Sequence, residues 1–200
     1  SDATLAGGLE VLYRPYHAVT PRQVTLKQAA GAAAGILSRG ADCVYLFNYF
    51  QDGHPDWLWA DYLKTLNAMN SLDALRNMPR CVGVTYRDIR TAAEKYRPPL
   101  PASGKEIVLS LNPGPLPEEN WDCLLSIAVE MPKTEQASPP SASVDGKPCR
   151  LTGEKKEEKY SVFSYLVPRD ALAENNAHEI KIDGAGRPLT VHRLELSFEK

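Results

Sequence analysis

One stretch, residues 20–52, restricts the fold of this chain more than any other, because a helix-forming segment leads directly into a strand-forming one. Residues 20–40 (TPRQVTLKQAAGAAAGILSRG) predict a helix, and residues 41–52 (ADCVYLFNYFQD) predict a buried strand that ends in polar and aromatic side chains. Thr20 and Gln23 have the spacing of a capping box. The stretch therefore predicts a helix followed by a strand whose C-terminal end carries candidate functional groups.

The inside of the predicted helix consists mainly of small side chains and includes Gly31 and Gly35, before Gly40 ends it. A glycine inside a helix costs about 1 kcal/mol relative to alanine, so we expect a neighbouring layer to approach this helix closely. The strand at residues 43–47 is continuously apolar, which is typical of strands buried on both faces in parallel sheets. With a strand signal at residues 7–13, the pattern predicts a parallel strand-helix-strand unit.

The segment GADCVYLFNYF at residues 40–50 resembles the last strand of the TIM barrel in a family of glycoside hydrolases, loosely related to the clan that includes family 10 xylanases. Members of that family carry a pattern like TPE-x-x-x-x-A-A-x-x-x-x-x-x-GADG-x-YLFN and have a β-sandwich after the barrel. In this chain Arg22 replaces the glutamate and Cys43 replaces the last glycine, whereas YLFN is complete. The resemblance implies the last strand-helix units of a TIM barrel.

The length of 200 residues limits this expectation, because a complete TIM barrel needs about 250 residues. We therefore expect residues 1–79 to be an incomplete, C-terminal portion of a barrel. Two parallel strands need further cover for their faces and edges. The missing N-terminal barrel portion, the downstream domain or a self-association partner would supply it.

From residue 80 onward the apolar residues follow a period of two, which indicates half-buried strands of an all-β unit. Roughly seven such runs occur, the usual number for a sandwich. We therefore expect residues 80–200 to form a β-sandwich, and the charged run at residues 153–159 to be a solvated turn. Between the two parts, residues 56–66 predict a helix with a broad apolar face, and Ser71 begins another short helix.

The end of the chain is similar to the galactose-binding-like jelly rolls that follow many carbohydrate enzymes. The Asp145-Gly146 hairpin signal and the phrase at residues 174–180 carry this similarity, with Glu174 in place of the usual glycine. The predicted fold class is therefore α/β plus all-β, in which the last units of a TIM barrel precede a jelly-roll-like β-sandwich.

Glu10 is the candidate catalytic residue, because the resemblance implies a catalytic glutamate on the next-to-last barrel strand. Glu10 falls early in its predicted strand, however, and an inward glutamate paired with a basic neighbour is an equally good interpretation. A glycosidase also needs a second carboxyl group, which this chain would have to obtain from sequence outside residues 1–200.

Four residues just past the strand are candidates for substrate binding: Asn48, Tyr49, Asp52 and Trp57. An amide and a carboxylate can hydrogen-bond sugar hydroxyls, and an indole can cover the apolar face of a pyranose. The alternative is a strand-end cap for Asn48 and helix packing for Trp57. His17 and His54 lie in neighbouring loops and could join the same rim.

Composition and motifs exclude several other classes of function. The formal net charge of −2 and the scattered basic residues give no footprint for nucleic acid. No apolar run reaches the roughly 20 residues that span a membrane. We also expect no cofactor, because the sequence has no phosphate loop or dinucleotide fingerprint. The first residues contain no signal peptide, which leaves the compartment open, an extracytoplasmic one included.

The four cysteines are far apart, with no C-x-x-C pair, so we expect free thiols and no metal site.

The sequence leads to two hypotheses for function. In the first, the chain is a fragment of a glycoside hydrolase that acts on poly- or oligosaccharides and is inactive by itself. In the second, it is a non-catalytic carbohydrate-binding or protein-interaction β-sandwich module.

Overall fold

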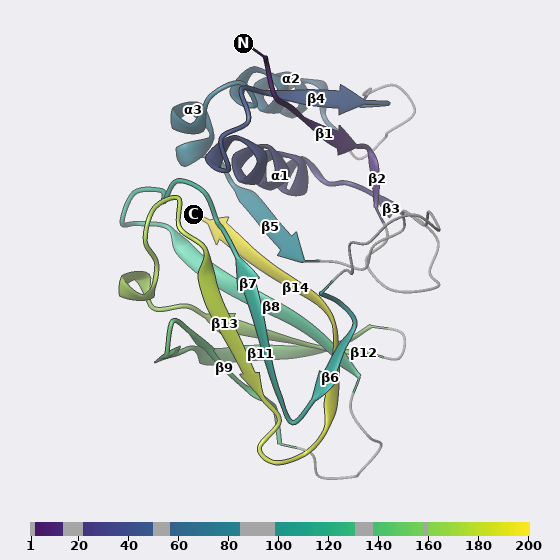
Figure 1. Cartoon of the computed structure of the whole chain (residues 1–200), viewed down its shortest axis with the longest axis vertical. Helices are drawn as coiled ribbons and strands as arrows, with labels where there is room; N and C mark the ends of the chain where they lie inside the picture. Colours follow the sequence, from purple (N-terminus) through teal and green to yellow (C-terminus); the bar gives the residue numbers. More distant parts are fainter. Residues whose placement is uncertain (1–2, 14–21, 50–56, 85–98, 131–137, 158–159) are drawn as a thin grey trace.

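The computed structural model describes residues 3–13, 22–49, 57–84, 99–130, 138–157 and 160–200. Of these residues, 47% lie in strands and 19% in helices. Figure 1 shows two parts: an N-terminal unit that contains all three α-helices, and a β-sandwich beneath it. We use "N-terminal unit" for residues 3–78 and "sandwich" for residues 80–200. The protein therefore has a β-rich fold.

The predicted fold class was wrong, because the described residues contain no series of TIM-barrel-like strand-helix repeats. Within the described ranges the strand-helix-strand pattern occurs once: β1 (Ala6–Glu10) pairs in parallel with β4 (Cys43–Phe47), and α1 (Leu26–Ser38) lies between them in sequence. A short antiparallel ribbon of β2 (Leu12–Tyr13) and β3 (Arg22–Gln23) precedes α1. The sequence pattern of one strand-helix-strand unit is local, and it cannot show whether that unit is repeated.

Helix α1 begins later than predicted. Its capping box consists of Thr25 and Gln28. The backbone amide of Gln28 donates to Thr25 Oγ1 at 3.2 Å, and the backbone amide of Thr25 donates to Gln28 Oε1 at 3.0 Å. The sequence carries two T-x-x-Q segments five residues apart, and Gln23 of the first lies in β3. At the other end Gly40, with φ of +90°, ends the helix as predicted.

The other two helices lie near their predicted positions. Helix α2 covers Trp59–Ala68, and α3 covers Leu72–Arg76, with Ser71 as its N-cap. The apolar face of α2 is only partly buried, because Leu58 and Trp59 are 69% and 59% exposed. No described helix is long and apolar enough to cross a membrane.

Two antiparallel sheets form the sandwich. One has the order β10-β9-β13-β7, and the other has the order β11-β12-β8-β14-β5, with β6 paired to β14. The strands are β5 (Arg80–Val84), β6 (Ala102–Gly104), β7 (Glu106–Leu111), β8 (Asp122–Glu130), β9 (Ser141–Val144), β10 (Lys147–Pro148), β11 (Arg150–Glu157), β12 (Tyr160–Leu166), β13 (His178–Asp183) and β14 (Leu189–Glu199). A short 3-10 helix covers Arg169–Ala171.

The period-two alternation correctly marks the buried face of these strands. In β7, for example, Ile107, Leu109 and Leu111 are buried and the residues between them are exposed. One cluster of buried residues joins both sheets and includes Leu125, Ile180 and Leu196. The sheets therefore pack face to face over a single core.

Strand β11 corrects the expectation of a solvated turn. Residues 153–157 of the charged run pair with β12 and form the outer strand of the larger sheet. All of β11 except Glu157 is exposed. An edge strand needs few apolar residues, and charged side chains there discourage pairing with other chains.

The N-terminal unit has a core of its own, which runs from Leu9 to Met78, on the other side of the predicted boundary at residue 79. Helix α1 joins it to the sandwich by packing against β5. A methyl group added at Gly31 would lie 1.9 Å from the Cys81 carbonyl oxygen, so the predicted close approach exists at this position. Arg80, which is fully buried, donates to the carbonyls of Leu75 and Arg76 at 3.0 and 2.8 Å.

Candidate functional site

The candidate site lies at the C-terminal end of the parallel pair β1–β4. Glu10 is the last residue of β1 and lies opposite Phe47, the last residue of β4. The prediction that Glu10 falls early in its strand was therefore wrong. Asn48 follows Phe47 directly, so the structure brings Glu10 and Asn48 to the same end of one sheet.

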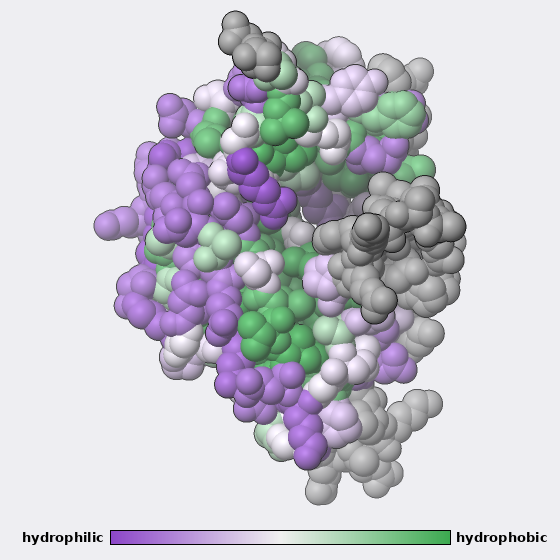
Figure 2. All heavy atoms as spheres, in the orientation of Figure 1, coloured by the Kyte–Doolittle hydropathy of each residue, from purple (hydrophilic) through white to green (hydrophobic). Residues whose placement is uncertain are grey.

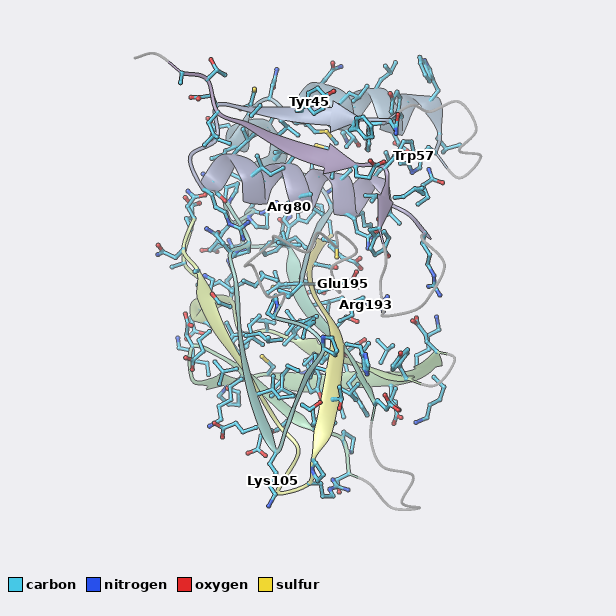
Figure 3. All side chains as sticks on the ribbon, turned by 45° about the vertical axis from the view of Figure 1, so that its right-hand side comes forward. Tyr45, Trp57, Arg80, Lys105, Arg193 and Glu195 are labelled. Atoms are coloured by element: carbon cyan, nitrogen blue, oxygen red, sulfur yellow. The ribbon has the colours of Figure 1, made fainter. Side chains whose placement is uncertain are left out.

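One face of this sheet is open and aromatic. Tyr45 and Phe47, two residues apart on β4, are 59% and 50% exposed, and Gly8 lies opposite Tyr45. We call the surface formed by Gly8, Glu10, Tyr45 and Phe47 the aromatic face. Figure 2 shows apolar residues at the surface of the N-terminal unit. Figure 3 shows Tyr45 at the opposite end of the molecule from Lys105.

The exposure of β4 corrects the expectation of a strand buried on both faces. Val44 and Leu46 pack on the core of the N-terminal unit, whereas Cys43, Tyr45 and Phe47 point the other way. A continuously apolar strand indicates that both faces suit burial, but not that both are covered. Sequence reasoning therefore missed Tyr45 and Phe47 as candidate contact residues.

Tyr49 and Trp57 lie in a buried aromatic cluster with Tyr62. The ring centroids are 4.8 Å apart for Tyr49 and Trp57, and 5.7 Å apart for each of these with Tyr62. Only 3% of Tyr49 and 4% of Trp57 is exposed, so neither ring presents an open face to a ligand. Trp57 takes the alternative role considered from the sequence, that of a packing residue.

The polar groups of this cluster have different environments. Tyr62 Oη donates to the Tyr49 carbonyl at 2.9 Å. Tyr49 Oη is buried without a hydrogen-bond partner in the described part of the chain, and burial raises the pKa of this phenol, so it stays protonated. The cluster fixes the chain directly after Asn48.

Asn48 and Glu10 are both exposed. Asn48 has φ of +52°, a conformation that asparagine tolerates better than most residues, so its presence also has a local structural reason. Glu10 Oε1 accepts from the Val11 amide at 3.0 Å, which holds the carboxylate beside the strand end. Asp52, His17 and His54 lie outside the described residues.

No group of three or more His, Cys, Asp or Glu residues that could hold a metal ion occurs within the described ranges. All four cysteines are free, and burial raises the pKa of Cys81 and of Cys123 to about 12. Cys43 is exposed at the start of β4, not buried as its apolar neighbours suggest.

Comparison of the sequence with protein-family models and with curated proteins finds no match. The function must therefore be inferred from the site itself. The site offers two aromatic rings, a carboxylate and an amide at one end of an open sheet.

Proposed function

We propose that this chain is a non-catalytic carbohydrate-binding unit and that the aromatic face is its binding surface. The observation that carries the proposal is the exposure of Tyr45 and Phe47 beside Glu10. Large apolar side chains grouped on a surface and bordered by polar groups are typical of interaction sites. The proposal keeps the non-catalytic carbohydrate binding of the second hypothesis, but assigns it to the N-terminal unit instead of the β-sandwich.

The chemistry of this surface suits a sugar chain. Residues two apart on a strand are about 6.6 Å apart and point to the same side, so the rings of Tyr45 and Phe47 form one continuous apolar strip. Such a strip can cover the apolar faces of pyranose rings, while Glu10 and Asn48 can hydrogen-bond hydroxyl groups. Gly8 has no side chain opposite Tyr45 to obstruct a ligand.

Hydrolysis by the isolated chain is not part of the proposal. A glycosidase needs two carboxyl groups on either side of the bond, about 5 to 9.5 Å apart. At this end of the sheet the described residues supply Glu10. We therefore expect no release of reducing sugar from polysaccharides or of phenol from aryl glycosides. Turnover that is lost in Glu10→Gln would contradict this expectation.

Binding is tested by titration calorimetry of the whole chain with cello-, xylo- and galacto-oligosaccharides, and by co-sedimentation with insoluble polysaccharides. We expect at least one glycan to bind, and Tyr45→Ala and Phe47→Ala each to weaken the binding about tenfold. Val108→Ala is the matched control, because Val108 is 52% exposed on β7 in the sandwich. Equal loss in all three variants, or no binding to any glycan, would overturn the proposal.

The open edges of β1 and β4 favour a second candidate function, self-association. In the described residues these strands pair only with each other, and isolated two-stranded sheets are at best marginally stable in water. Edge strands are templates for pairing with another chain. Sedimentation equilibrium distinguishes the two candidates: a dimer that Phe47→Ala dissociates, without glycan binding, would replace the carbohydrate proposal.

A further inference from the structure

A groove of about 380 Å³ runs along α1 where the N-terminal unit meets the sandwich. One wall includes Leu9 and Leu12, and the other includes Val82 and Gly83 of β5. This volume falls in the range of small-molecule sites, which are mostly apolar with a few polar groups. The groove is separate from the aromatic face, although Glu10 borders both.

The direction of α1 places different residues at the two ends of the groove. Gln28, near the start of the helix, donates to Tyr13 Oη at 2.9 Å. Eleven residues later, Arg39 caps the other end of the helix. At 1.5 Å per residue, the two ends are roughly 16 Å apart. The groove is therefore elongated.

The end at Gln28 is acidic. Among the described residues, Glu10 and Glu195 line this end, Arg193 lies beside Glu195 and Glu157, and Arg22 lies near Tyr13, which gives these five side chains a formal charge of −1. Gln28 Nε2 donates to Glu195 Oε1 at 2.9 Å, and Arg193 Nε lies 3.4 Å from Glu195 Oε2. These contacts fix the position of the Glu195 carboxylate (Figure 3).

Tyr13 adds a donor at the same end. Burial raises the pKa of Tyr13 despite the hydrogen bond from Gln28, so the phenol keeps its O–H. The opposite end has the reverse charge: Arg39 is exposed, and its guanidinium has no hydrogen-bond or ion-pair partner among the residues that the structure describes. A cation and an acidic cluster thus lie at opposite ends of one groove.

The middle of the groove is apolar and has free space. Its α1 wall consists of Gly31, Ala32, Gly35 and Ile36. A methyl group added at Gly35 would meet no atom within 4 Å, although Gly35 is buried. The missing side chain at Gly35 therefore helps to keep the groove open.

We propose that this groove binds a short apolar peptide with free termini, in an extended conformation. The amino group would lie at the acidic end beside Glu10 and Glu195, and the carboxylate would lie at Arg39. The apolar side chains would cover Ala32 and Ile36. An extended chain spans about 3.3 to 3.6 Å per residue, so a groove of roughly 16 Å accommodates about four residues.

The test is an NMR or calorimetric titration of the whole chain with tetra-alanine, and with the same peptide acetylated at its N-terminus and amidated at its C-terminus. We expect the free peptide to bind and the doubly blocked peptide to bind at least tenfold more weakly, because both charges are lost. No saturation at millimolar tetra-alanine, or equal binding of the two peptides, would overturn the proposal.

Two pairs of variants locate the binding. Gly35→Leu should abolish peptide binding by filling the groove, whereas Gly35→Ala should leave most of the binding intact. If the leucine variant fails to fold, the comparison of free and blocked peptides still tests the proposal. Arg39→Gln should remove the preference for a free carboxylate and keep the preference for a free amine, with Arg150→Gln on β11 as the control. Unchanged terminal preferences in Arg39→Gln would contradict the proposed orientation.

Discussion

The sandwich and the parallel pair β1–β4 differ in how far the apolar side chains of their strands are buried. In the sandwich, Phe163 on β12 is 1% exposed, because a second sheet covers its face. On β4, Phe47 belongs to a continuously apolar strand and is 50% exposed. Apolar sequence is thus used for stability in one region and left available for contact in the other.

The two regions differ in how completely their sheets are covered. The sandwich buries its apolar residues from both sheets in one core, so it can fold around that core. The N-terminal unit packs one face of its small sheet on α1 and leaves the other open. Exposed apolar surface lowers stability relative to burial, and the grouping of Tyr45 and Phe47 on this face is the observation on which the proposed binding function rests.

The largest expected difference between the two regions is in thiol reactivity. Cys43 is exposed at the start of β4, whereas burial raises the pKa of Cys123 on β8 from 9.0 to about 12. Three pKa units reduce the thiolate fraction roughly a thousandfold, and the thiolate is the reactive form. In the native protein, iodoacetamide should therefore label Cys43 first and Cys123 last, as followed by peptide mass spectrometry.

Cys43→Ser should remove the fast phase and leave the slow phases unchanged. After denaturation without reduction, mass measurement of the unsubstituted protein should show four labels. Two labels or fewer would contradict the free thiols.

A matched pair of phenylalanine truncations tests the comparison through stability. Phe163→Ala should lower the free energy of unfolding by about 3 to 5 kcal/mol, because it leaves a cavity in the core. Phe47→Ala should change it by about 0.5 kcal/mol or less, because the side chain is half exposed. Urea denaturation followed by circular dichroism measures both. Similar losses in the two variants would show that the aromatic face is covered in solution.

Two glycines of α1 test the junction between the regions. Gly31→Ala should destabilise by about 1 to 3 kcal/mol, because the new methyl group would collide with the backbone of Cys81. Gly35→Ala should stabilise by up to about 1 kcal/mol, because it removes a helix-interior glycine and meets no neighbour. Thermal unfolding of both variants provides the measurement. A stable Gly31→Ala variant would mean that α1 can move away from β5.

The aromatic cluster and the capping box show what the sequence could and could not predict about the N-terminal unit. Local signals predicted α1, β4 and the parallel pairing, because helix propensity and apolar runs act over a few residues. The choice between the capping boxes at Thr20 and Thr25 depends on the pairing of β3 with β2, which no short pattern encodes. The burial of Trp57 likewise depends on its contact with Tyr62.

The sandwich was easier to predict than the site, because alternation is a direct consequence of strand geometry. The charged strand β11 was not predicted, because an edge strand exposed to solvent does not need alternating apolar and polar residues. At the site, the sequence predicted the parallel pair and the position of Asn48 after its second strand, but not the position of Glu10 at the end of β1, because the predicted strand continued to Tyr13. The exposure of Tyr45 could not be predicted, because it depends on what covers the sheet.

The smallest expected effect concerns the Asp145–His178 pair, within the sandwich. Partial burial raises the pKa of Asp145, but hydrogen bonds from His178 and from the Glu179 amide outweigh this and lower it below its usual value. The pair therefore stabilises the fold above the unfolded pKa of about 3.9, and this stabilisation is lost as pH falls through the lower folded pKa.

Asp145→Asn should accordingly be slightly less stable than the unsubstituted protein at pH 7, with a difference that shrinks below about pH 4. Acid titration of unfolding by circular dichroism measures this difference. Asp183→Asn is the control, at a turn where the carboxylate accepts from the Ala185 amide at 2.7 Å. A difference that grows on acidification would contradict the assigned direction of the pKa shift.

The charged outer strand β11 disfavours the addition of a further strand to the large sheet. Lys155 and Lys156 and their acidic neighbours cover one border of the large sheet with solvated charge, so a second molecule cannot extend that sheet without stripping water from them. The small sheet of β1 and β4 has no such protection at Gly8 and Tyr45. Addition of a further strand is therefore disfavoured by charge at the β11 border of the large sheet, whereas no charged side chain opposes it at Gly8 and Tyr45 of the small sheet.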